Sequence, residues 1–369
     1  MAIISGGKGV RTKGTALPII INGNMAVHQR GGSFADVGDG IYTLDRFETH
    51  KNTDGAVTVS QEDLTSGNAY LDGFRTALKC DVTTADGTLA GTQRFFIQQI
   101  VEARNLQALK FGTANAEKLT LAFWVKATKT GTHIVRMYQY DDDRSVSIAY
   151  TVDSTNTWEK KVMNFPADTT GVIDNDNGQG IQITWAIGAG ASFQSGTLAT
   201  SWAGNTSAND FVGQVNGLDN TNNNFHLTGV QLEVGEYDST TIPNFQHEDF
   251  GDNLNRCFRY YYRNNGRSGF GAGTGFVQDG AVKGYIYHTI PVAPRAEMSF
   301  SLSGTSAAII SIDGNASDDV QSISSTHADA FPYKDYEFNF VTDGSSITDK
   351  CGMGIRINAS NYIEGSAEL

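Results

Sequence analysis

The sequence predicts an all-β protein: a jelly-roll β-sandwich, then a short helical or extended neck, then a smaller C-terminal β domain. Glycine is frequent, with 41 residues, and proline is scarce, with 6. Short apolar runs alternate with polar residues and are separated by turns rich in Gly, Ser, Thr, Asn and Asp. Few stretches show the spacing of an amphipathic helix. Alternating runs between such turns are typical of strands, and many short strands favour a sandwich.

The first 40 residues form a Gly-rich, basic arm that one apolar run interrupts. An isolated β-branched run in a polar arm either packs on its own chain or docks by pairing with another protein. We leave both readings open. The residues that would dock are Leu17, Ile19, Ile20 and Ile21.

Residues 41–237 carry the segments that predict the jelly roll. Each alternates between apolar and polar residues or is an apolar run bounded by turn residues, as expected for strands of a sandwich. The predicted strands are 42–47, 74–82, 94–102, 119–125, 133–140, 146–152, 158–165, 181–187 and 225–234.

Residues 238–265 are predicted to be a linker and neck. Pro243 favours an extended backbone that cannot donate to a central ladder. Over 250–262, apolar residues recur at steps of four, three and four, which is the seam of a short helix and of a coiled coil. We expect this seam to hold an oligomer together, although the run of tyrosines is equally able to start a strand. The seam residues are Phe250, Leu254, Cys257 and Tyr261.

Residues 266–369 carry shorter apolar runs flanked by Ser, Gly and Asp. We expect a thin second sandwich, which would gain stability by burying a face against copies of itself. Its predicted strands are 271–277, 282–292, 298–302, 307–312, 336–341 and 352–357.

The overall charge restricts the partners. The formal net charge is −13 and the isoelectric point is near 4.9. Nucleic-acid binding needs clustered Lys and Arg, so it is not expected, whereas neutral glycans and divalent cations fit this balance. The three cysteines show no metal-ligand spacing and are expected to be free thiols. No signal-peptide core or apolar run of membrane length occurs, so we expect a soluble protein that is not secreted by the general route and does not insert into membranes.

Eight segments of the chain carry a family resemblance. They follow the family's order and are spread along most of the sequence, and 225–235 with 252–263 are the most specific. The segments are 22–34 (NGNMAVHQRGGSF), 42–47 (YTLDRF), 119–133 (LTLAFWVKATKTGTH), 169–190 (TTGVIDNDNGQGIQITWAIGAG), 195–202 (SGTLATSW), 225–235 (FHLTGVQLEVG), 252–263 (DNLNRCFRYYYR) and 366–369 (SAEL).

These segments resemble the tail-fibre or capsid-fibre proteins of tailed phages, many of them marine podophages. The resemblance implies a virion surface protein without chemistry of its own, commonly trimeric, with a middle domain like a carbohydrate-binding module. We further expect that the N-terminal arm docks to other virion proteins, and that the protein is made in the host cytoplasm. Attachment to capsid or to tail is left open. So is a purely structural role as a fibre or decoration protein without a ligand.

Aromatic side chains are the candidate glycan contacts, because an exposed ring stacks on a sugar face while polar neighbours bind its hydroxyls. Trp124 and Trp185 lie inside apolar alternation and are expected in the core. The candidates for a sugar site are Tyr138, Tyr140, Trp158 and Trp202, with core or rim packing as the favoured reading for the two tryptophans.

Asp174 and Asp176 are the candidate metal ligands. They are two residues apart in a Gly- and Asn-rich loop, and carboxylates at this spacing can face one hard cation such as calcium. No Glu follows at the distance that would close an EF-hand loop, so a solvated turn capped by its own side chains is the favoured reading. Calcium is the single cofactor left open. The acidic run 141–143 is expected to be a solvated hairpin tip.

No catalytic motif is present. The chain has no Gly-x-Ser-x-Gly elbow and no HExxH, and no carboxyl group stands in an apolar run that would raise its pKa for acid catalysis. We therefore expect no enzyme activity. The competing interpretation is a glycan-degrading tail spike, which needs two carboxylates facing each other across a cleft.

Overall fold

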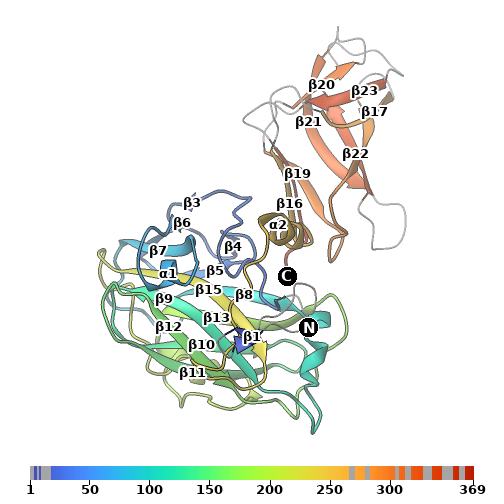
Figure 1. Ribbon diagram of the computed structural model, residues 1–369. Helices are drawn as coiled ribbons and strands as arrows, with labels where there is room; N and C mark the ends of the chain where they lie inside the picture. The colour runs from blue at the N-terminus through green and yellow to red at the C-terminus, as the bar shows by residue number, and fades with distance from the viewer. Residues whose placement is uncertain are drawn as a thin grey trace. The chain divides into compact units, whose positions relative to one another are not determined.

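The computed structural model describes residues 4–5, 8–9, 18–265, 271–278, 283–303, 307–311, 317–326, 335–342, 352–356 and 362–369 (Figure 1). The chain divides into two compact units, residues 1–250 with Leu369 and residues 251–368. None of the helices in these ranges combines the length and hydropathy needed to span a lipid bilayer. A short hairpin of β1 (Ile4–Ser5) and β2 (Lys8–Gly9) opens the chain.

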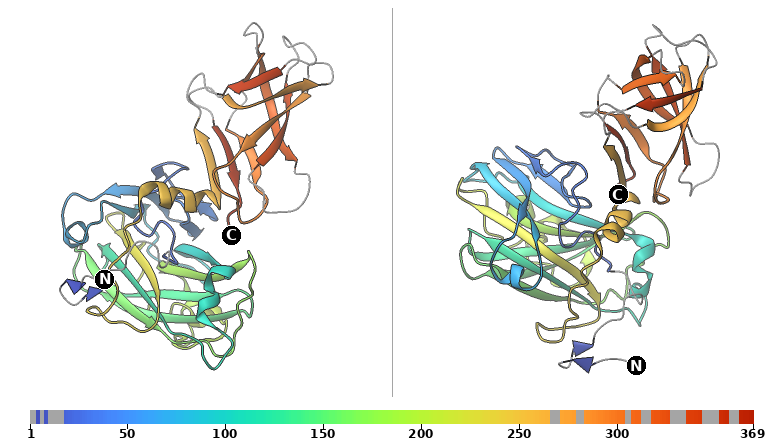
Figure 2. Two further views of the ribbon diagram at one scale, coloured as in Figure 1. Left: turned by 45° about the vertical axis from the view of Figure 1, so that its right-hand side comes forward. Right: turned by 45° about the horizontal axis from the view of Figure 1, so that its top comes forward.

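The first unit is a sandwich of two antiparallel sheets, as the sequence predicts (Figures 1 and 2). The seven-stranded sheet has the order β14 (Ala203–Gly204), β11 (Arg144–Val152), β10 (Gly131–Gln139), β13 (Gln179–Ala189), β8 (Arg94–Glu102), β5 (Glu48–Asn52) and β4 (Ile41–Tyr42). The six-stranded sheet has the order β12 (Glu159–Phe165), β9 (Leu119–Ala127), β15 (Asn224–Val234), β7 (Thr76–Thr84), β6 (Ala56–Asp63) and β3 (Ser33–Phe34).

Alternation along these strands places one set of side chains between the sheets, where they form a single core. Trp185 of β13 packs edge-on against Phe123 of β9, with ring centroids 5.9 Å apart. Both rings are fully buried, so the expectation that Trp185 belongs to the core is confirmed. The helical elements of this unit are short: α1 (Asn68–Leu71), η1 (Ala103–Leu109), η2 (Ala191–Phe193) and η3 (Ser207–Asn209).

The apolar run of the N-terminal arm packs on its own chain, which corrects the docking alternative for the described part of that run. Ile20 and Ile21 are buried and Ile19 packs against the main core. The Gln99 side chain holds this segment: its Oε1 accepts the Ile21 N–H at 3.1 Å and its Nε2 donates to the Ile21 carbonyl at 2.9 Å. The Ile side chains are therefore not free to pair with another protein. Leu17 lies outside the described residues.

One predicted strand, 42–47, is a turn. β4 ends at Tyr42 and β5 begins at Glu48, and between them the Thr43 N–H donates to the Phe47 carbonyl. Arg46 lies inside this turn with a φ of 72°, a left-handed conformation that a strand does not allow. The apolar alternation here reflects inward-facing side chains of a turn.

The predicted linker also belongs to the sandwich. Ile242 is 4% exposed, and the Pro243 carbonyl accepts a hydrogen bond from Gln231 Nε2 at 3.1 Å. Phe245 packs edge-on against Phe74, with ring centroids 4.8 Å apart. Residues 242–245 therefore cover part of the outer face of the six-stranded sheet.

The helix α2 (Phe250–Phe258), whose first residue ends the first unit, is shorter than the predicted helix over 250–262. Tyr261 lies in the next strand, β16 (Tyr261–Asn265), and is 3% exposed, and Cys257 is 1% exposed. The four predicted seam residues therefore do not form one exposed helical stripe, which is a correction. Phe250, 58% exposed, and the partly buried Leu254 remain on the helix surface.

The rest of this unit is a closed barrel and a small sheet, where the sequence suggested a thin sandwich. The barrel order is β17 (Gly271–Gln278), β18 (Lys283–Thr289), β22 (Asp335–Thr342), β21 (Ser317–Thr326), β20 (Ala307–Ser311) and β23 (Gly352–Arg356). β16 pairs with β24 (Tyr362–Ser366), which pairs with β19 (Ser299–Leu302). The polar strand β21, absent from the prediction, pairs with β20 and β22 and closes the barrel.

Candidate functional site

The outer face of the seven-stranded sheet carries a row of polar and aromatic side chains. Because alternate residues point to the same face, pairing register identifies neighbours on it. Tyr138 of β10 pairs with Gln182 of β13, and one step further along these strands Arg136 pairs with Thr184. Thr184 in turn pairs with Gln98 of β8. The strands thus bring an aromatic ring, a guanidinium and two amides onto one surface.

The row continues onto β5, where Glu48 pairs with Gln98 and His50 pairs with Phe96. Glu48 and His50 are two residues apart and therefore share the outer face with Gln98. Four adjacent strands, β10, β13, β8 and β5, thus each contribute at least one polar side chain to the same surface. We call this surface the polar face, defined by Tyr138, Tyr140, Gln182, Gln98, Glu48 and His50.

A loop covers the neighbouring part of the same sheet. Between β13 and β15, Phe193 and Phe211 pack over Phe96, with ring centroids 5.7 and 4.5 Å from it. Ile134, Ala186 and Ala189 also belong to this small apolar cluster. The loop therefore forms a wall over one end of the outer face, and the polar face is the part that it leaves uncovered.

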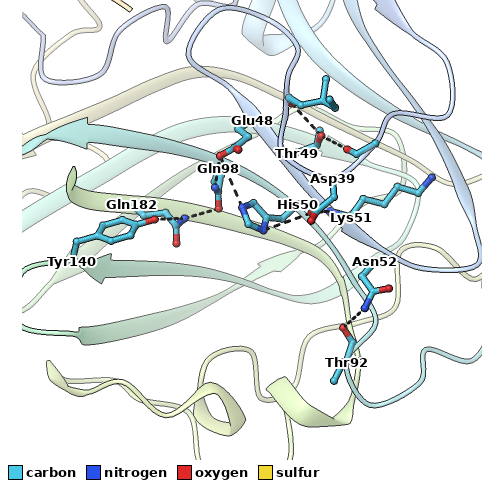
Figure 3. A network of polar contacts seen from close by, with 12 residues as sticks. Asp39, Glu48, Thr49, His50, Lys51, Asn52, Thr92, Gln98, Tyr140 and Gln182 are labelled. Atoms are coloured by element: carbon cyan, nitrogen blue, oxygen red, sulfur yellow. Dashed lines mark hydrogen bonds and ion pairs between the residues drawn. The ribbon is translucent and has the colours of Figure 1, made fainter. Parts of the chain in front are cut away.

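The amides of the polar face form a hydrogen-bonded relay across the strands (Figure 3). Gln182 Nε2 donates to the Tyr140 hydroxyl at 3.1 Å and to Gln98 Oε1 at 2.7 Å. Gln98 Nε2 then donates to Glu48 Oε2 at 2.6 Å. Gln98 is 2% exposed and Gln182 is 7% exposed, so the relay is rigid and lies at the floor of the face.

His50 ends the row between two carboxylates (Figure 3). Its Nε2 lies 4.0 Å from Glu48 Oε2, and its Nδ1 lies 3.8 Å from Asp39 Oδ1. Burial lowers the pKa of His50 and outweighs the opposing field of Asp39. The imidazole is therefore neutral at pH 7 and adds no positive charge to the polar face.

Two tyrosines form the aromatic end of the polar face. The rings of Tyr138 and Tyr140 meet edge to face, with centroids 4.8 Å apart, and both side chains are half-buried. The Tyr138 hydroxyl donates to Asp143 Oδ1 at 2.8 Å. Burial, together with this bond, raises the pKa of Tyr138 to about 12, so the phenol stays protonated. The sequence prediction that these two tyrosines share one face is confirmed.

Arg136 lies against one face of the Tyr138 ring. The guanidinium lies 4.6 Å from the ring centroid, a cation–π distance. Its Nε is 3.4 Å from Asp210 Oδ1, and its Nη2 donates to Asn205 Oδ1 at 3.2 Å. Both partners come from the covering loop, so the wall and the aromatic end of the face hold each other in place.

Two buried hydroxyls on this surface have no hydrogen-bond partner within the described part of the chain. Thr184 Oγ1 lies in the row between Arg136 and Gln98, and Ser147 Oγ lies beside Arg136 on β11. Buried hydroxyls are normally paired, and a lost partner costs about 1–3 kcal/mol.

The other two predicted sugar contacts are elsewhere, which corrects the prediction. Trp158 is 6% exposed and lies on the six-stranded sheet, in a cluster with Phe74 and close to His226. Trp202 is 8% exposed, packs edge-on against Phe111, and donates its indole N–H to the Pro166 carbonyl at 2.8 Å. Neither ring presents a face for stacking on a sugar.

Sequence reasoning missed the amides and the carboxylate of the polar face. Gln98 and Gln182 stand inside strands that are otherwise buried, and an amide in such a strand is the signal that marks a special surface. The hydrogen bond between them could not be predicted from the sequence, because the two residues are 84 positions apart. Glu48 directly follows the predicted strand 42–47 and is the first residue of β5, which was not among the predicted strands.

The predicted metal ligands form a capped turn. Asp176 Oδ1 accepts the Gly178 N–H at 2.7 Å, and the Asp174 N–H donates to Asp141 Oδ2 at 3.0 Å. Within the described ranges, no group of three or more His, Cys, Asp or Glu side chains is arranged to hold a metal ion. The turn capped by its own side chain, which the sequence favoured, is the arrangement found.

Comparison with known proteins gives distant likenesses only. No family model matches the sequence, and no curated protein matches it. One similar structure is the enzymatically active domain of bacteriophage CBA120 tailspike protein 4, at 13% identity and a TM-score of 0.29 over 54% of this chain and 21% of that chain. A sugar-binding protein described as putative, from Bacteroides thetaiotaomicron, has 14% identity and a TM-score of 0.32 over 59% of this chain and 100% of that chain.

A family 11 carbohydrate-binding module of a Clostridium thermocellum cellulase shows 11% identity and a TM-score of 0.26. The match covers 56% of this chain and 98% of the module. Likeness at these scores is too distant to transfer a function.

Proposed function

We propose that this protein is a non-catalytic, carbohydrate-binding protein of a bacteriophage virion and that the polar face is its sugar site. The observation that carries the sugar site is the row in which the half-buried rings of Tyr138 and Tyr140 adjoin the fixed amides of Gln182 and Gln98.

A saccharide offers apolar C–H patches and hydroxyl groups on the same molecule. An aromatic side chain buries the C–H patches, and nearby amides and carboxylates bind the hydroxyls. The amide of Gln182 is already fixed by the relay, so it would lose little conformational entropy on binding. Adjacent strands are about 4.8 Å apart, so a row over four strands spans about 14 Å, enough for an oligosaccharide.

The virion part of the proposal is supported by the sequence resemblance to phage fibre proteins. A virion surface protein displays many copies of its sugar site, and avidity then turns weak contacts into stable attachment. We propose a trimer made in the host cytoplasm and assembled onto the capsid or the tail. Imaging of virions that carry a labelled copy tests this placement, and particles that lack the label would disprove it.

Binding to host-surface polysaccharide tests the site. We expect Tyr138→Ala to weaken binding about tenfold, because the loss of an aromatic contact of roughly 1.4 kcal/mol corresponds to that factor. Tyr70→Ala is the matched control, since Tyr70 is also half-buried beneath an arginine, 4.0 Å from Arg75, but lies away from this sheet. The site is refuted if both variants bind as tightly as the wild type.

The absence of catalysis is tested separately. Incubation of the purified protein with the same polysaccharide is expected to release no new reducing ends. Release of reducing ends that survives repeated purification would establish the competing function, a glycan-degrading tail spike.

Oligomer formation through α2 is tested by the molecular mass. Phe250 and Leu254 are the predicted seam residues that keep exposed surface. We expect light scattering to give a trimer mass, and Leu254→Asp to reduce it to that of the monomer. A monomer mass for the wild type at micromolar concentration would contradict the proposal.

A further inference from the structure

The direction of the hydrogen bonds in the relay is set at one end by Glu48. A carboxylate only accepts hydrogen bonds, so the neighbouring amide must turn its NH2 group toward it. Gln98 Nε2 donates to Glu48 Oε2 at 2.6 Å, which leaves Gln98 Oε1 as the acceptor on the other side. Gln182 must then turn its own NH2 group toward Gln98, and the bond of 2.7 Å has this direction.

This direction decides what the relay offers to a ligand. Gln182 Nε2 has two hydrogens, and the bonds to Gln98 Oε1 and to the Tyr140 hydroxyl use both. Its carbonyl oxygen points away from these bonds in Figure 3. Gln182 therefore presents an acceptor. Within the relay, the donors that remain are the second N–H of Gln98 and the hydrogen of the Tyr140 hydroxyl.

Other groups around the polar face add acceptors. Asp39 lies beside His50, and Asp143 accepts the Tyr138 hydroxyl at 2.8 Å, so that phenol is already committed as a donor. Carboxylates have several lone pairs each, and these two keep acceptor capacity toward a ligand.

The basic side chains nearby are engaged elsewhere. Arg136 is held by Asp210 and Asn205 of the wall. The Lys51 ammonium pairs with Asp36, and Arg94 lies over the Phe193 ring at 6.0 Å. A bidentate guanidinium is the usual partner for a carboxylate or sulfate. The charge of Arg136 is already balanced by Asp210, and its side chain is only 13% exposed.

We infer that the polar face binds a donor-rich saccharide, neutral or amino-substituted, and rejects saccharides that carry carboxylate or sulfate groups. Glu48 is the positioning residue for this selectivity, since it orients both amides without having to touch the sugar. The inference rests on the proposed sugar-binding function and narrows its ligand class.

Matched oligosaccharides test the selectivity. The probes are tetrasaccharides of glucose, galactose and N-acetylglucosamine, each compared with the same chain after oxidation of its C6 hydroxyl groups to carboxylates. Where the N-acetylglucosamine chain binds, its de-acetylated form is added as the amino sugar. We expect oxidation to weaken binding at least about tenfold at low salt, because each carboxylate meets acceptors and not donors.

Glu48→Gln tests the role of Glu48. Glutamine has the same shape but can donate, so it no longer fixes the direction of the relay. We expect the discrimination between a chain and its oxidised form to fall to about twofold, while the melting temperature and circular dichroism stay unchanged. Glu236→Gln is the matched control, because Glu236 is an exposed carboxylate paired with Lys118 beyond β15, and it should keep the full discrimination.

The outcomes separate the two proposals. If an oxidised chain binds as well as or better than its parent, or if Glu48→Gln keeps the wild-type discrimination, the inference is overturned and sugar binding stands. If no probe binds and host polysaccharide does not bind either, the proposed function itself fails. Binding of the parent chains with loss of discrimination in Glu48→Gln alone supports both.

Discussion

Asp168 and Arg144, the first residue of β11, form a bidentate ion pair. Arg144 Nε donates to Asp168 Oδ2 at 2.7 Å, and Nη2 donates to Oδ1 at 3.1 Å. The same carboxylate accepts the backbone N–H groups of Thr170 and Gly171 at 3.0 and 3.1 Å. Asp168 is 2% exposed, so one buried carboxylate holds a strand and a loop together.

Replacement of Asp168 by alanine should therefore be strongly destabilising. The change leaves a largely buried guanidinium and two backbone donors unpaired, and we expect a loss of about 3–5 kcal/mol in the free energy of unfolding. Denaturant unfolding measures this loss. Asp153→Ala is the control, because that carboxylate is 69% exposed and its pair with Lys161 should contribute less than about 1 kcal/mol. Equal effects of the two variants would contradict the prediction.

Gly229 is predicted to tolerate no side chain. Its φ is +61°, it lies at the register shift of β15, and a Cβ there would be 2.6 Å from Cζ of Phe74. We expect Gly229→Ala to cost about 2–4 kcal/mol, from backbone strain and overpacking together. Gly204→Ala has open space around its Cβ and should change stability by less than about 0.5 kcal/mol. Similar melting temperatures for the two variants would refute this reading.

The Glu62–His226 pair should make stability depend on pH. His226 Nδ1 lies 2.5 Å from Glu62 Oε2, and this hydrogen bond lowers the pKa of Glu62 from 4.5 to about 2. Because the pKa of Glu62 is lower in the folded state, its ionised carboxylate stabilises the native state above pH 4.5. This contribution to the free energy of unfolding is lost as the pH falls toward about 2. Burial lowers the pKa of His226 from 6.5, so protonation of the unfolded state begins to reduce stability below that pH.

We expect Glu62→Gln to be less stable than the wild type at pH 7 by about 1 kcal/mol, after allowance for solvent screening of the Glu62 side chain, which is 32% exposed. The difference should disappear between pH 4.5 and about 2. Urea unfolding across this pH range measures it, with Glu236→Gln as the control for loss of a surface charge. A difference that is constant over the whole range would show that Glu62 does not act through its ionisation.

Asp141 is predicted to destabilise the folded state when its carboxyl group is ionised. Burial raises the pKa of Asp141 above 3.8, and the nearby carboxylates of Asp174, Asp176 and Asp142 raise it further, against the Asp174 N–H bond. A raised folded-state pKa means that stability falls as the pH rises from 3.8 through the folded-state value. Asp141→Asn keeps an acceptor for the Asp174 N–H and removes the charge.

This variant should melt at a higher temperature than the wild type at pH 7. The gain should vanish below pH 3.8 and shrink at high salt, because screening weakens the repulsion in the wild type. Scanning calorimetry at pH 7 and below pH 3.8 measures the melting temperatures of the variant and the wild type. A lower melting temperature at pH 7 would show that the repulsion is outweighed by contacts of the ionised carboxylate.

Local alternation was sufficient to locate most strands. β8 (Arg94–Glu102) coincides with its predicted segment, and β15 (Asn224–Val234) differs by one residue. These strands face the core with every second side chain, and this period of two is a local property of the sequence. The prediction missed β6 (Ala56–Asp63), in which Gln61 takes the next core-facing position after Val57 and Val59 and so ends the apolar alternation.

Side-chain partnerships between distant segments were decided by tertiary structure. The two hydrogen bonds between Gln99 and Ile21 join residues 78 apart and pull the N-terminal run into the core. When these hydrogen bonds are not known, the sequence of the run is equally consistent with a strand that docks on another protein. A local pattern cannot distinguish the two outcomes, since both need the same β-branched residues.

The sequence by itself determined an all-β sandwich and a shared face for Tyr138 and Tyr140, because these follow from periodicity within short segments. The polar face was decided by the sheet order alone, which brings β10, β13, β8 and β5 side by side although they come from distant parts of the chain. The same order places Trp158 on the other sheet. Strand order depends on which faces bury the most apolar surface together, and that is a property of the whole chain.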